Sequence, residues 1–106
     1  MLVSNLEFLP DKKIDTHLGL VQGSSVRSKH VGRDIMASIR NIFGGELKGY
    51  TELLQDSRSE AMQRMLSQAE SIGADAVLNI RFSTSSITAG AAEIYVYGSA
   101  VKLAEQ

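Results

Sequence analysis

The sequence predicts an α+β fold in which a small antiparallel sheet packs against helices in two layers. Apolar residues spaced by two or its multiples indicate strands over 14–26, 76–83 and 93–103. Apolar residues spaced by three and four indicate amphipathic helices over 31–43 and again from 46 or 50 to 72. The subunit is therefore predicted to run β-α-α-β-β along the chain.

The first predicted strand, from Ile14 to Val26, contains two glycines. Gly19 and Gly23 indicate a bulge or a close approach of another backbone. They do not predict a phosphate-binding loop, because no Gly-Lys-Ser/Thr sequence follows and their spacing lacks the dinucleotide-binding fingerprint.

Two helices are predicted between the first strand and the second. Over 31–43 the isoleucines lie on one face, and Gly44-Gly45 ends the helix. The second helix has an apolar stripe of about six turns, followed by Gly73, which is suited to the left-handed position after a helix. Glu60 and Arg64 are expected to pair on its outer side. The stripe consists of Leu53, Leu54, Ala61, Met62, Met65, Ala69 and Ile72.

The last two strands are expected to form a hairpin around Ala89-Gly90-Ala91. In the first of them, Leu78, Ile80 and Phe82 are predicted to face inward, with the polar residues between them facing outward. A short extra strand between Val3 and Phe8 is expected to add to a sheet edge, in this subunit or in a neighbouring one.

The last strand has two faces that both need cover. Helices can cover one of them, and a second subunit is the natural cover for the other. The first face carries Ile94, Val96 and Ala100, and the second carries Tyr95, Tyr97, Val101 and Leu103. The sequence therefore predicts a homo-oligomer whose interface includes Tyr95, Tyr97 and Val101.

Length and composition limit the class of protein. The 106 residues are expected to form one domain, 1–106, and the absence of cysteine excludes disulfides, thiolate metal sites and cysteine nucleophiles. The start of the chain has no signal-peptide pattern, and no apolar run approaches the ~20 residues of a membrane helix, so a soluble cytoplasmic protein is expected. The net charge of −1 argues against nucleic acid as a partner. The basic segment from Arg27 to Arg40 is interpreted as a solvated helix face.

Six short segments form a series along nearly the whole chain. They are Gly19-Leu20-Val21-Gln22-Gly23, Arg33-Asp34-Ile35, Gly44-Gly45-Glu46 followed by Tyr50-Thr51, Arg58 to Met65, Gly73-Ala74-Asp75-Ala76-Val77, and Tyr97-Gly98-Ser99-Ala100-Val101. Together they resemble the YbjQ-like family. The resemblance implies a subunit similar to that of dodecin, assembled as a ring-shaped pentamer in which short extra strands join neighbours. The family also carries the label of a heavy-metal-binding domain, and its physiological function is unsettled.

The residue types give that label little support. Soft metals prefer thiolates, and this chain has none. The candidate metal ligands are His17 and His30, thirteen positions apart, together with Glu93. No HxH or HExxH spacing connects them, so surface or core histidines are the favoured interpretation. No cofactor is predicted, and a metal ion stays an open alternative.

Three further residues are candidate ligand contacts, because the resemblance places Glu46, Arg58 and Asp75 beside helix ends. Arg58 is interpreted first as a structural ion-pair partner and second as a ligand-contacting arginine. Asp75 is expected to stabilise a turn. No catalytic residue is predicted, since the serines at 24–25 and 83–86 lack the Gly-x-Ser-x-Gly pattern.

Three functions remain, in descending order. The first is a non-catalytic homo-oligomeric module that binds a small ligand or a protein partner. The second is a metal-binding or metal-buffering protein. The third is an enzyme whose site is built between subunits, which the sequence of one chain does not exclude.

Overall fold

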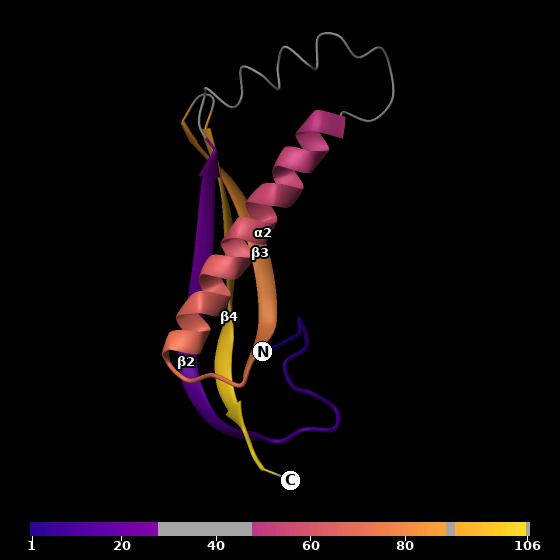
Figure 1. Cartoon of the computed structure of the whole chain (residues 1–106), viewed down its shortest axis with the longest axis vertical. Helices are drawn as coiled ribbons and strands as arrows, with labels where there is room; N and C mark the ends of the chain where they lie inside the picture. Colours follow the sequence, from indigo (N-terminus) through magenta and orange to yellow (C-terminus); the bar gives the residue numbers. More distant parts are fainter. Residues whose placement is uncertain (28–47, 89–90, 106) are drawn as a thin grey trace.

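The computed structural model describes residues 1–27, 48–88 and 91–105. In chain order these form β1 (Leu2–Val3), β2 (Ile14–Arg27), α2 (Lys48–Ser71), β3 (Ala76–Thr88) and β4 (Ala91–Leu103). The described strands make one sheet in the order β1-β3-β4-β2, with β1 parallel to β3 and the other pairs antiparallel. α2 lies diagonally across one face of this sheet (Figure 1). The predicted α+β class is confirmed, but the sheet is mixed rather than antiparallel as predicted, because β1 adds to it parallel to β3. The predicted helix at 31–43 lies outside the described residues.

α2 packs mainly against β2, and the two backbones come close together. Ala61, Met65 and Ala69 of the helix and Val21 of the strand are fully buried between them. Gly23 lies under the helix, where a Cβ atom would come within 2.1 Å of the carbonyl oxygen of Ala61. The close approach predicted from the glycines of this strand is confirmed.

The C-terminus of α2 is closed by Gly73, as its position in the sequence predicts. Gly73 has a φ of 78°, and its N–H donates to the carbonyl of Glu70 at 3.0 Å. The N–H of Ala74 donates to the carbonyl of Ala69 at 3.0 Å, which completes a Schellman motif. Within the described ranges, no helix combines the length and apolarity that crossing a membrane requires.

β3 departs from the predicted alternation at Asn79. This residue has a φ of 55°, in the left-handed region, and the register with β4 shifts between Leu78 and Arg81. The bulge places two residues of β3 against one of β4, which reverses the faces on either side of it. Leu78 therefore packs on the face away from α2, whereas Ile80 packs under the helix. The prediction that they share a face is wrong, and Phe82, also predicted inward, is 45% exposed.

The N-terminal segment, residues 1–13, covers part of the face away from α2. Its β1 strand pairs with the start of β3, and Leu9 packs against Leu78 and Val101. Val101 is 3% exposed, so its side chain is already covered within its own subunit. The extra strand predicted between Val3 and Phe8 is shifted to Leu2–Val3 and adds to the edge of its own sheet.

β4 has the two faces that the sequence predicts. Ile94, Val96 and Ala100 pack under α2, whereas Val101 and Leu103 pack on the other side. Tyr95 and Tyr97 are half-buried, and their ring centroids lie 5.5 Å apart at an interplanar angle of 30°. The two rings form an aromatic pair beyond the part of the face that Leu9 and its neighbours cover.

Candidate functional site

A polar cleft follows the free edge of the sheet at β2. It has a volume of about 560 Å³ and opens to solvent. Side chains from α2 and β4 meet the edge strand here, because α2 crosses β2 closely over Gly23. The cleft is lined by Gln22, Gly23, Ser24, Arg64, Gln68, Glu93 and Tyr95. We call it the β2-edge cleft.

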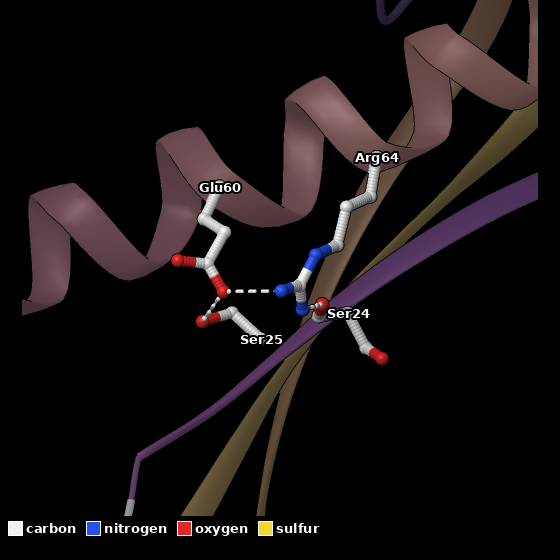
Figure 2. A network of polar contacts seen from close by, with 4 residues as sticks. All are labelled: Ser24, Ser25, Glu60 and Arg64. Carbon is white, nitrogen blue, oxygen red and sulfur yellow. Dashed lines mark hydrogen bonds and ion pairs between the residues drawn. The ribbon is translucent and has the colours of Figure 1, made fainter.

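Arg64 is held in the β2-edge cleft by contacts with both the strand and its own helix (Figure 2). Its Nη1 donates to the carbonyl oxygen of Ser24 at 2.6 Å, and its Nη2 lies 2.9 Å from Oε1 of Glu60. The same Oε1 accepts a hydrogen bond of 3.2 Å from the hydroxyl of Ser25, which is fully buried. The predicted Glu60–Arg64 pair is confirmed, but it lies against β2 rather than on the outer side of the helix, where it orients the guanidinium along the strand edge.

Two glutamines complete the edge of the β2-edge cleft. The backbone N–H of Gln22 donates to Oε1 of Gln68 at 2.8 Å, so a helix side chain satisfies a strand donor. The side-chain oxygen of Gln22 accepts a hydrogen bond from the hydroxyl of Tyr95. Helix α2 thereby supplies one acceptor and one cationic donor to backbone groups on the free edge of β2.

The chemistry of the β2-edge cleft suits a polar ligand. A guanidinium carries five N–H donors in a fixed plane, and the contacts to Ser24 and Glu60 engage only its two terminal nitrogens. The side chain of Arg64 is 59% exposed, so a ligand can reach it. Glu93 and Tyr95 add acceptors and a hydroxyl from β4 on the other side of the edge.

The structure separates the residues that the sequence proposes as metal ligands. His17 pairs with Val101 of β4 and Glu93 pairs with Val26 of β2, so they stand eight strand positions, about 27 Å, apart in the sheet. One ion cannot contact both within a subunit. His30 lies outside the described residues. Across the parts of the chain that the structure describes, no three His, Cys, Asp or Glu side chains gather closely enough to hold a metal ion.

The other predicted contacts also lie apart from one another. Arg58 lines a separate groove beside Met62 and Phe82, on the flank of α2 that faces β3. Asp75 accepts a hydrogen bond of 2.9 Å from the backbone N–H of Leu103, so its carboxylate connects the start of β3 to the end of β4. Glu46 lies outside the described residues. Of the predicted ligand and metal residues that the structure describes, only Glu93 lines the β2-edge cleft.

The residues that define the β2-edge cleft were not predicted as a site. The helical spacing predicts only that Arg64 pairs with Glu60, and no sequence pattern indicates a role for Gln22 or Gln68. Their meeting depends on the crossing of α2 over β2, which no local pattern encodes. The sequence does contain one signal, Gly23. Because a glycine lets the helix approach the strand closely, two helix side chains four residues apart, Arg64 and Gln68, can reach the edge of β2.

Comparison with known proteins places the chain in a family. A family model described as "Putative heavy-metal-binding" matches residues 1–104. The chain belongs to this YbjQ family. A UPF0145 protein from Hahella chejuensis is 66% identical over 101 residues, which cover 95% of this chain and 97% of that protein. A UPF0145 protein from Archaeoglobus fulgidus is 50% identical over 103 residues, covering 97% and 95%.

A solved structure supports the fold. The crystal structure of a protein of unknown function from Pediococcus pentosaceus, assigned to the DUF74 family, superposes with a TM-score of 0.65 and covers 98% of both chains. The two sequences are 12% identical, so this likeness concerns the fold alone. This chain thus has the small α+β fold of that protein, and the expected resemblance to the YbjQ-like family is confirmed by the family match.

Proposed function

We propose that this YbjQ family member is a cytoplasmic homo-oligomeric binding module, and that its β2-edge cleft binds a polar ligand without catalysis. The observation that carries the proposal is the placement of Arg64, whose guanidinium is oriented by Ser24 and Glu60 and yet is 59% exposed. A preoriented cation loses little side-chain freedom when it takes up a ligand, which favours binding.

Size and lining support a small or narrow ligand. A volume of about 560 Å³ falls within the range of roughly 300–1,000 Å³ that is typical of ligand sites. The lining combines a guanidinium, a carboxylate, amides and a phenol, which match a ligand with both donors and acceptors. The hydroxyl of Ser25 contacts the carboxylate of Glu60, but Ser25 is fully buried behind the strand. We therefore assign this hydroxyl to structure rather than to nucleophilic catalysis.

Uncovered apolar side chains support the oligomer. Leu20 is 63% exposed and Val26 is 50% exposed on β2, and Phe82 is 45% exposed on β3. The aromatic pair of Tyr95 and Tyr97 is half-buried on the face away from α2. A second copy of the chain would bury these groups, and the ring-shaped pentamer that the family resemblance implies is the assembly we propose.

Native mass spectrometry of untagged protein, purified gently from its own host, tests both parts together. We expect a multiple of the 11.5 kDa subunit that carries additional mass. Arg64→Leu should lose the additional mass and keep the subunit number, whereas the control Arg58→Leu, on the same helix but in a different groove, should keep both. A bare monomer would overturn the oligomer. Additional mass that survives Arg64→Leu would place the ligand elsewhere.

A further inference from the structure

A second cavity lies on the opposite face of the sheet from α2. Its volume is about 220 Å³, and it lies between the N-terminal segment and the strands β2, β3 and β4. Four polar residues and three aliphatic residues line it. The polar residues are Glu7, His17, Asn79 and Ser99, and the aliphatic residues are Ile14, Leu78 and Val101. We call it the bulge cavity, because two irregularities of the sheet form its walls.

Both neighbours of β4 are bulged beside this cavity. In β3 the register shifts between Leu78 and Arg81, and in β2 it shifts between His17 and Gly19. The two shifts face β4 over the short stretch Gly98 to Val101. Bulges in natural sheets redirect side chains and are enriched beside functional sites. Because both bulges lie beside one cavity, His17 of β2 and Asn79 of β3 line the same cavity.

The backbone of Asn79 provides an independent observation. Its φ of 55° lies in the left-handed region, which few residues other than glycine adopt and which asparagine tolerates better than most. Hydrogen bonds hold it there, since its N–H donates to the carbonyl of Leu6 at 2.8 Å and the N–H of Ile80 donates to Ser4 at 3.2 Å. Non-glycine residues held in the left-handed region by surrounding contacts cluster at functional sites. The contact with Leu6 also fixes the chain next to Glu7.

The lining defines the chemistry of the ligand. Glu7 provides a negative charge, and Asn79 and Ser99 provide further oxygen acceptors. Ile14, which is 39% exposed, provides apolar contact that a hydrated metal ion would not use, while the almost fully buried Leu78 and Val101 form the floor of the cavity. A ligand with a cationic group and a short hydrocarbon chain would match both the carboxylate and the aliphatic part of the lining.

We propose that the bulge cavity binds a short aliphatic primary amine, with its ammonium group at Glu7 and its chain over Ile14, the exposed aliphatic residue of the lining. The volume of 220 Å³ admits about seven non-hydrogen atoms at ~30 Å³ each. This site is independent of the β2-edge cleft, which is lined by none of the same residues.

Nitrogen-15 NMR of the full-length chain tests the proposal with pentylamine as the probe. We expect saturable shifts of the amide signals of Glu7, Asn79 and Ser99, with no shift at Arg64 or Gln68. Pentanol, which has the same length and no charge, should bind more weakly by up to about fivefold, the upper end of the effect expected for an exposed ion pair. The amide signals of Arg64 and Gln68 report separately on ligand binding in the β2-edge cleft, so the failure of one proposal can be distinguished from the failure of the other.

Glu7→Gln should weaken pentylamine binding by about fivefold. Glu70→Gln, which removes the same charge from the exposed surface of α2, should leave it unchanged. Unmoved signals with pentylamine, or equal binding of pentanol, would overturn the assignment. Shifts with zinc chloride at concentrations where pentylamine has no effect would identify the cavity as a metal site instead.

Discussion

Replacing Gly23 with alanine should separate α2 from β2. The added Cβ would lie 2.1 Å from the carbonyl oxygen of Ala61, 2.6 Å from the backbone nitrogen of Met65 and 3.1 Å from Cβ of Arg64. Non-bonded heavy atoms attract best at about 3.5 Å or more, so the helix would have to move outward by about 1 Å. Backbone atoms of a helix cannot rotate away as a side chain can.

The cost follows from the contacts that this movement weakens. Val21, Ala61, Met65 and Ala69 are fully buried at the interface, and a gap of ~1 Å forfeits up to about half of the attraction between facing atoms. Overpacking a core costs roughly 1–3 kcal/mol, and we expect the upper end, ~3 kcal/mol, for Gly23→Ala. In a domain of this size that corresponds to a fall in Tm of about 15 °C.

Urea unfolding followed by circular dichroism, at one fixed subunit concentration, measures the change in the free energy of unfolding. Ser24→Ala is the matched control, because Ser24 neighbours Gly23 on the same strand, is only half-buried and already carries a Cβ. It should change the free energy of unfolding by no more than ~0.5 kcal/mol. A Gly23→Ala protein as stable as Ser24→Ala would refute the close approach of α2 to β2.

The remaining predictions concern backbone strain, assembly and metal. Asn79→Ala should lower the free energy of unfolding by ~1 kcal/mol and Asn79→Gly should change it little, since alanine resists a φ of 55° and glycine does not. Equal urea midpoints for the two variants would contradict that geometry. Tyr97→Asp should release monomers by placing a charge in an apolar interface, and an unchanged sedimentation velocity profile would show that this face is not the contact. The double variant His17→Ala, His30→Ala should leave the metal content per subunit unchanged in elemental analysis, whereas loss of bound metal would establish a histidine site.

Local patterns predicted the elements of the fold whose causes are local. Gly73 closes α2 with the left-handed conformation that its position after the apolar stripe indicates, and the two faces of β4 follow from simple alternation. Leu78 was placed on the wrong face, because alternation assumes a regular strand and Asn79 inserts a bulge. Asparagine tolerates the left-handed region, so its presence permits such a bulge without requiring one.

The β2-edge cleft could not be predicted from periodicity. Arg64 reaches Ser24 forty residues away in the chain, and Gln68 reaches Gln22 across forty-six. Such contacts depend on the angle and register at which a helix crosses a strand, and these are set by packing across the interface. Glu93, which lies on the rim of the β2-edge cleft, is a candidate from the sequence, but as a metal ligand. No sequence pattern places it in one cleft with Arg64.

The side chains that line the β2-edge cleft also protect the protein against aggregation. β2 is a strand of 14 residues at the border of the sheet, and an unpaired border of this length can recruit strands from other molecules. Gln68 and Arg64 already bond the N–H of Gln22 and the carbonyl of Ser24, so a foreign strand would have to break both bonds before pairing there. We therefore expect two helix residues outside the apolar core to limit strand-to-strand association of the protein at high concentration.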